Sequence, residues 1–195
     1  RAMPGVLAVL TGADVTADLG SAYLYNYGST TAYAISAFDG YSNAQAATVT
    51  GYANATAIMA GDVFAYAYSG DYGVSYAGGI DVTATNGDAL LVAGSVVGYA
   101  ESGFDGLLIA SGADVYSQFG DSTAILYGQS GAVAVSGDYG TSVANGVVVE
   151  SPTGAAYLYS GDLAAAYAIS KYDGTSVAQA AVVAGYTDAT AISPG

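Results

Sequence analysis

The stretch AYAISAFDGYSNAQAATV at residues 32–49 decides the fold, because similar lines recur throughout the chain. Related segments begin at Ala65, Gly98, Ala132 and Ala166, so the spacing is about 33–34 residues, which is the signature of a solenoid or another stacked repeat. Each line closes on a valine, and one more valine fits a step earlier: Val15, Val49, Val82, Val115, Val149 and Val183. We therefore expect one repeat domain, 1–195, of about six tandem units.

Each unit has the pattern strand, turn, strand, turn, strand. Residues 65–69 alternate small and large side chains, 70–73 (GDYG) form a turn, and a second strand follows. Turn residues recur about every 15 to 18 residues, which indicates two half-units of about 17 residues. The sequence leaves open whether one coil contains a half-unit or a whole unit. It also leaves open whether the strands stack in parallel or fold back as antiparallel hairpins. Units four apart agree best: residues 21–58 and 155–192 match at more than half of their positions.

The composition indicates an all-β protein. Charged residues make up only 9% of the chain, which contains 28 Gly and 19 Tyr but no Cys, His or Trp. Small, β-branched and aromatic residues favour strands and tight turns. The net charge of −14 argues against nucleic acid and anionic membranes as partners, since both require basic patches. No apolar run approaches the length of a transmembrane helix.

Two sets of positions accept only small residues. In the first strand these are alternate positions such as Ala32, Ala34 and Ser36. In the second strand they form the column Ala44, Ala77, Ala110, Ala144 and Ala178. These columns and the valine column predict the core of a β-solenoid with a narrow, small-residue interior. The opposite assignment stays open, because Tyr33 and Tyr66 could fill a core, but the charge of Glu101 favours Tyr on the outside.

Aspartates in the turns form a candidate calcium ladder. Carboxylates and turn carbonyls are the hard oxygen ligands that calcium prefers. The alternative is that Asp stabilises GD and DG turns by local hydrogen bonds, without a metal. The candidate ligands are Asp71, Asp88, Asp105, Asp121, Asp138 and Asp173.

The residue inventory argues against an enzyme. Without His or Cys, the chain lacks the usual parts of a serine triad or a thiol nucleophile. The two glutamates, Glu101 and Glu150, fall in different columns of the repeat. We predict no catalytic residue, and no cofactor other than the candidate calcium.

The units resemble those of bacterial surface proteins. Strand–turn–strand units with N-A-x-A turns, as in 43–46 and 54–57, and GD turns are similar to curli-like functional amyloids and to the passengers of haemagglutinin-type adhesins. This resemblance implies an extracellular or cell-surface location.

The function that we expect is structural. Neither end resembles a cap, and the chain stops about seven residues before the point of the repeat cycle at which it begins. Uncapped repeats that stack in register form an open filament. We therefore predict a self-assembling extracellular filament or matrix protein whose partner is itself, with no membrane insertion. The alternative is a segment of a large repeat adhesin, or a module that binds polysaccharide, calcium or mineral.

Overall fold

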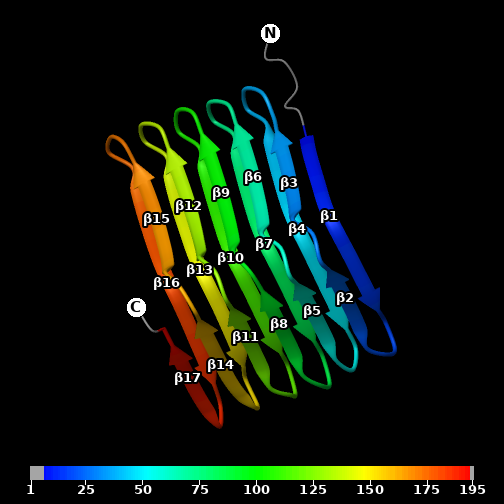
Figure 1. The fold of residues 1–195 in the computed structure, drawn as a ribbon. Coiled ribbons are helices and arrows are strands. Elements are labelled where there is room, and N and C mark those ends of the chain that lie inside the picture. Colours follow the sequence, from blue (N-terminus) through cyan, green and yellow to red (C-terminus); the bar gives the residue numbers. More distant parts are fainter. Residues whose placement is uncertain (1–6, 194–195) are drawn as a thin grey trace.

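The protein is a parallel β-solenoid. The computed structural model describes residues 7–193, where all the regular secondary structure is β-strand. Seventeen strands form three parallel sheets, and every complete coil contributes one strand to each sheet (Figure 1). Five complete coils are followed by two strands of a sixth. The expected all-β solenoid fold is therefore confirmed.

The three sheets differ in strand length. Sheet A contains β1 (Leu7–Ala17), β4 (Tyr41–Gly51), β7 (Val74–Ala84), β10 (Leu107–Ser117), β13 (Thr141–Ser151) and β16 (Thr175–Gly185). Sheet B contains β2 (Ala22–Asn26), β5 (Ala55–Met59), β8 (Ala89–Ala93), β11 (Ser122–Leu126), β14 (Ala155–Ser160) and β17 (Asp188–Ile192). Sheet C contains β3 (Thr30–Ile35), β6 (Val63–Ser69), β9 (Val96–Ser102), β12 (Ser130–Ser136) and β15 (Ala164–Ser170).

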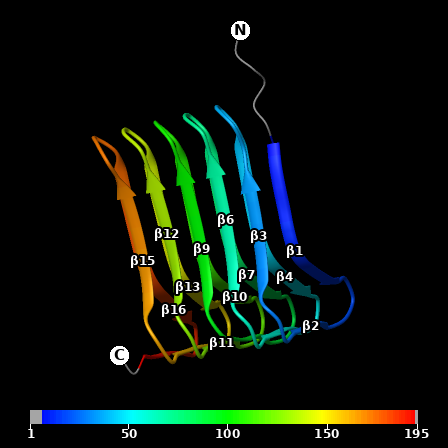
Figure 2. The ribbon, with the colours of Figure 1, turned by 45° about the horizontal axis from the view of Figure 1, so that its top comes forward.

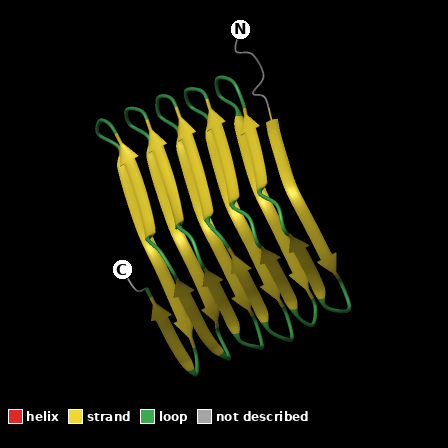
Figure 3. Ribbon diagram, in the orientation of Figure 1, coloured by secondary structure: helices red, strands yellow, loops and turns green. Residues whose placement is uncertain are grey.

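The register between coils settles the length of the repeat. Leu7 pairs with Tyr41, and Tyr41 with Val74, so one coil takes the whole unit and its strands run parallel. Val15 pairs with Val49, and this column continues through every coil to Val183. The expected half-units do not form coils of their own. Instead each coil has three turns, which gather in rows along the solenoid (Figure 3).

A bulge bends every strand of sheet A near its middle. The described burial pattern of β4 alternates except at Ala46 and Ala47, which are both buried, and Ala46 is skipped in the pairing with both neighbours. The column that contains Ala46 holds no residue larger than Ala and consists of Gly12, Ala46, Gly79, Gly112, Gly146 and Ala180. At Gly112 even a Cβ would collide with the carbonyl oxygen of Gly146, so this coil requires glycine.

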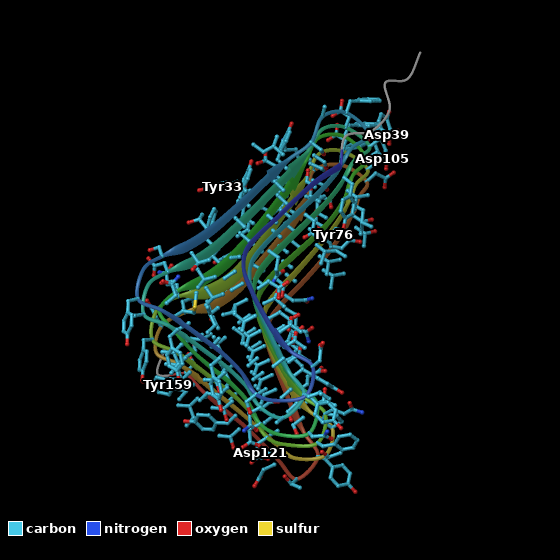
Figure 4. The ribbon with its side chains drawn as sticks, turned by 90° about the vertical axis from the view of Figure 1, so that its right-hand side faces the viewer. Tyr33, Asp39, Tyr76, Asp105, Asp121 and Tyr159 are labelled. Atoms are coloured by element: carbon cyan, nitrogen blue, oxygen red, sulfur yellow. The ribbon has the colours of Figure 1, made fainter. Side chains whose placement is uncertain are left out.

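The bulge gives the solenoid a bent cross-section with two arms. Figure 4 looks along the stack and shows the bend between them. In one arm the first part of sheet A packs against sheet C, and the interior there is made mostly of Ala and Ser. In the other arm the end of sheet A packs against sheet B around larger side chains such as Val49, Met59 and Leu91. The predicted narrow interior thus describes the first arm, and the second arm is wider.

Large and small residues alternate from coil to coil in the wider arm. One inward column of sheet B reads Leu24, Ala57, Leu91, Ala124, Leu158 and Ala191. The neighbouring inward column has Met59 and Leu126 in the coils where the first column has Ala. Leu91 and Leu158 therefore each lie between two alanines, which fills the interior at normal density. The packing repeat is two coils, and units four apart keep the same phase of this alternation.

Hydroxyl groups line the closed edge of the narrow arm. The Ser42 hydroxyl donates to Ser36 Oγ over 2.9 Å and lies 2.6 Å from the Tyr68 carbonyl oxygen. Ser75 repeats the contact one coil on, with 2.9 Å to Ser69 Oγ. Buried hydroxyls need such partners because an unpaired polar group is costly to bury. The sheet A column that contains Ser42 and Ser75 is not serine in every coil, because the fully buried Leu108 lies in register between Ser75 and Ser142.

The narrow arm predicts how a larger core residue would act. Ala144 is fully buried, whereas its neighbour Val143 points outward and is half-buried. We expect Ala144→Leu to lower the free energy of unfolding by about 1–3 kcal/mol, because the two sheets cannot separate locally to admit the side chain. Val143→Leu is the matched control and should change it by less than about 0.5 kcal/mol. Urea unfolding followed by circular dichroism measures both, and equal effects would contradict this account of the interior.

Candidate functional site

The two open ends of the solenoid are the first candidate site. Within residues 7–193, no strand, helix or loop covers the outer edges of β1 and β2 or of β16 and β17. These edges carry backbone N–H and C=O groups that a further coil would pair. Edges of this length are templates for association, which most natural sheets block with charge, proline or a cap.

The ends also expose the interior columns. In the small-residue column Ala44, Ala77, Ala110 and Ala144 are buried, but Ala178 in the last coil is exposed. Val49, Val82, Val115 and Val149 are fully buried, whereas Val15 and Val183 at the two ends are only half-buried. The predicted core residues therefore lie in the expected columns. The described end coils leave apolar interior surface in solvent.

The predicted calcium ligands fall on two separate edges. Asp71, Asp105, Asp138 and Asp173 lie in the turns between sheets C and A, and Asp88 and Asp121 lie in the turns between sheets A and B (Figure 4). One continuous ladder of all six is not formed. Within the described part of the chain, no three acidic residues are grouped so that they could hold a metal ion.

On the edge between sheets A and B, each side chain bonds to the next coil. Asn54 Oδ1 accepts the N–H of Asp88 at 2.9 Å, and Asp88 Oδ1 accepts the N–H of Asp121 at 3.0 Å. Asp121 Oδ1 continues the series by accepting the N–H of Ala155 at 2.8 Å. Residue types with a short side-chain oxygen are needed here because these turn N–H groups would otherwise lack a partner. These side chains thus accept hydrogen bonds from the next coil. The sequence alone suggested bonds within a single turn instead.

On the edge between sheets C and A, aromatic and acidic residues exchange places in alternate coils. The two central turn residues are Phe38-Asp39, Asp71-Tyr72, Phe104-Asp105, Asp138-Tyr139 and Tyr172-Asp173. The rings form a continuous zigzag, with edge-to-face contacts between ring centroids 5.4 to 5.8 Å apart. Sequence reasoning missed this pattern, although the reversed order of the two residues is visible in the repeat.

The alternation also separates the carboxylates. Coils are about 4.8 Å apart, so acids in the same turn position lie two coils, or about 10 Å, apart. Asp71 Oδ1 accepts the N–H of Phe104 at 2.8 Å, and a Cβ on Gly103 would occupy the place of that oxygen. The second of the two residues is always in the left-handed region, with φ between 50° and 62°. The glycine and the alternation together let a row of acids stack with little repulsion.

A small group of acids stands on the outer face of sheet A. Asp81 pairs in register with Asp114, and Glu150 lies one coil further on. Desolvation by neighbouring side chains, then the charges of Asp81 and Glu150, raise the pKa of Asp114 to about 6. Desolvation also raises the pKa of Asp81, against a hydrogen bond from the Thr83 hydroxyl at 3.0 Å. This face therefore gains protons as the pH falls toward 5.

The outer face of sheet C is aromatic. Tyr33, Tyr66 and Tyr99 are adjacent in one column, and the last two rings stack with centroids 5.4 Å apart. The Tyr66 hydroxyl donates to Glu101 Oε2 over 3.2 Å. Partial burial and the nearby charge of Glu101 raise the pKa of Tyr66 to about 12. The glutamate thus lies on the outside, as its charge indicated.

Comparisons with protein-family models, with curated proteins and with solved structures found no match for this chain. Within residues 7–193, no helix is long and apolar enough to span a membrane. The fold and the geometry of the ends therefore carry the functional argument.

The zigzag predicts the result of reversing one turn. Asp71→Tyr combined with Tyr72→Asp moves the carboxylate into one column with Asp39 and Asp105, and it removes the bond to the Phe104 N–H. We expect the free energy of unfolding to fall by about 1–3 kcal/mol, with part of the loss recovered in 1 M salt. Thermal melts at low and high salt measure this. Phe104→Tyr combined with Tyr139→Phe keeps the alternation and should melt like the original protein; an equal loss there would contradict the explanation.

The raised pKa of Asp114 predicts how stability depends on pH. A folded pKa near 6 lies above the ordinary 3.8, so the folded state binds the proton first and stability rises as the pH falls from 7 to 5. Asp114→Asn should flatten this slope in melting temperature. Val148→Asn, in the same column one coil on, should leave the slope unchanged. Identical slopes for the original protein and Asp114→Asn would refute the assignment. Moderate salt should reduce the effect, because Asp114 keeps an exposed surface.

Proposed function

We propose that the protein is a structural, self-assembling filament protein whose copies stack head to tail through the open ends. The single observation that carries the proposal is that sheets A and B each contain six strands and leave both outer edges open within the described residues. If β1 of one copy pairs with β16 of another, sheets A and B continue without interruption, while sheet C, which has five strands, lacks one strand at the junction. The pairing repeats the step of one whole unit that relates the coils within the chain.

The alternation of large and small residues in the core, which we call its phase, supports this stacking. The inward column of sheet B ends on Leu158 and Ala191, and it begins on Leu24 and Ala57. Across a head-to-tail junction the column would read Leu158, Ala191, Leu24, Ala57, so large and small residues keep alternating. With an odd number of sheet B strands, two residues of like size would meet. The bulge column also continues, because Ala180 would lie beside Gly12.

The free energy of stacking would come from both backbone and core. Each junction would pair the edges of an 11-residue and a five-residue strand. It would also cover Val183, Ala178 and Val15, which the chain alone leaves exposed or half-buried. Heterologous contacts of this kind do not close, so the product is an open fibre. A filament of six coils per copy would rise by about 29 Å per copy.

The absence of Cys and the predominance of acids suit an exported matrix protein, and we propose an extracellular or cell-surface location. The role would be like that of curli-like fibres or of the passengers of haemagglutinin-type adhesins, the proteins that its repeats resemble. A second candidate function is an adhesin segment. It is favoured by exposed aromatic side chains such as Tyr33, Tyr167 and Tyr25, which could stack on sugar rings. In that case the chain would stay monomeric and bind polysaccharide saturably.

Two adjacent substitutions test the stacking. Val183 faces the interior at the open end, and Val182 on the same strand faces outward. Val183→Lys should leave the monomer folded, because the site is open to water, but should abolish filaments by burying an unpaired charge at the junction. Val182→Lys adds the same charge and should still assemble. Sedimentation and negative-stain electron microscopy distinguish the two, and filaments of Val183→Lys would contradict the proposal.

A compensating pair tests the phase within the same assay. Ala191→Leu would set two leucines against each other at the junction and weaken assembly. Adding Leu24→Ala restores the alternation there, so the double variant should assemble better than Ala191→Leu alone. If the second substitution gives no recovery, the phase of the core plays no part in stacking.

A further inference from the structure

The outer face of sheet C is a flat apolar surface that the described chain leaves uncovered. Its strands β3, β6, β9, β12 and β15 stand as one row (Figure 2). Three outward residues per coil make three columns along the stack. Of the outward residues of these strands, only Glu101 is charged, although the chain carries a net charge of −14. Exposed apolar surface of this extent marks an interaction site.

The size of the outward side chains changes along the stack. The second coil carries the largest set, Phe64, Tyr66 and Tyr68, and the fourth carries the smallest set, Gly131, Val133 and Val135. Over the fourth and fifth coils lies a groove of about 280 Å³, lined by Val97, Gly131, Val133, Leu163, Ala165 and Tyr167 among others. The third coil, with Val97, Tyr99 and Glu101, lies midway between the large and the small set.

We propose that two copies of this chain pair face to face through sheet C, with their stacks running in opposite directions. A two-fold axis along the β9 strand turns the second coil onto the fourth coil of the partner. Phe64 then lies over Gly131 at the groove, Tyr66 over Val133, and Tyr68 over Val135. Isologous contacts of this type close as a dimer, and the large set fills the space above the small set.

The remaining coils agree with the same axis. Tyr33 in the first coil would face Tyr167 in the fifth, and Ile35 would face Ile169. The exposed fractions of these four side chains are all between 49% and 63%, so each pair offers similar surface. An arrangement with parallel stacks would instead set Phe64 against Tyr68 and leave the groove unfilled.

The area is sufficient for a specific dimer. Five strands of about seven residues cover about 23 Å by 24 Å, or about 550 Å² on each copy. The total of about 1,100 Å² exceeds the usual lower bound for a biological interface. A copy of the same chain also suits the charge, because Glu101 is the only charged outward residue of sheet C, so pairing through this face adds little to the repulsion between two strongly acidic proteins. End-to-end stacking is not required for this pairing.

One unfavourable contact makes the geometry testable. The axis along β9 brings Glu101 of one copy near Glu101 of the other, so pairing costs repulsion. Glu101→Gln removes the charge and can keep the hydrogen bond with Tyr66. We expect the dimer dissociation constant to fall about tenfold in sedimentation equilibrium. Val133→Glu should prevent dimers, whereas Val143→Glu, on the outer face of sheet A in the same coil, should leave them intact. Both valines are half-buried.

Crosslinking tests the relative direction, and the absence of native cysteine leaves no background. Facing sheets lie about 10 Å apart, too far for a disulfide, so a short bis-maleimide is the probe. A mixture of Tyr66→Cys and Val133→Cys proteins should crosslink several-fold more than either protein alone. In a head-to-tail stack these positions are four coils, about 19 Å, apart, so stacking does not produce the signal. Preferred crosslinking of Tyr66→Cys with itself, or no mixed crosslink above the background of Val143→Cys, would overturn the proposal.

Discussion

The close approach of sheets A and C is the constraint on which the rest of the structure depends. Ala44 and its equivalents face Ala32, Ala34 and theirs across a gap that admits nothing larger, as their complete or nearly complete burial indicates. A gap this narrow contributes less apolar burial per coil than an ordinary core. The stability must therefore come from repetition, with every coil pairing its backbone and columns with the next. The bulge in sheet A adds a second arm where leucine, valine and methionine can pack.

The same constraint decides what faces outward. The inward columns of the narrow arm hold small residues in most coils, with larger exceptions such as Leu108 and Val96. The tyrosines that favour strands lie on the outer faces, where they stack between coils. Most of the acids occupy turns. The edge between sheets A and B accommodates them through backbone N–H groups, and the edge between sheets C and A accommodates them in alternating positions. The outcome is a body with an apolar side, acidic edges and two ends whose sheet edges no segment within residues 7–193 covers. The association with further copies that we propose would use the apolar side and the ends.

A period of two coils runs through the molecule. It appears inside as the alternation of Leu91 with Ala124, and on the edge as the zigzag of Phe104 and Tyr139. Neither pattern needs the other, so their agreement shows that neighbouring coils are adapted as pairs. The proposed head-to-tail stacking would keep this period in the inward column of sheet B, where a slip by one coil would bring residues of like size together. In such a filament the structure would recur once for every copy along the axis.

The period, the strand character and the inward columns could be predicted from the sequence, because identical coils must place like residues above one another. Val49 and Ala44 could thus be assigned to the interior from the repeat alone. The bulge could not be predicted from the sequence. Two successive inward residues, Ala46 and Ala47, interrupt the alternation of inward and outward positions, and such an interruption does not by itself indicate a bulge. Spacing along the chain predicts a single ladder of aspartates, because it does not reveal which edge a turn occupies. Calcium binding and the functional role stay predictions.

Cryo-electron microscopy of the concentrated protein, prepared with calcium and with chelator, tests end-to-end stacking most directly. The account predicts filaments in both conditions, with strands about 4.8 Å apart along the axis and a rise of about 29 Å per copy. Reconstructed density should show Leu24 of one copy beside Ala191 of the next. Monodisperse single solenoids in both conditions, at concentrations where the ends meet often, would contradict it.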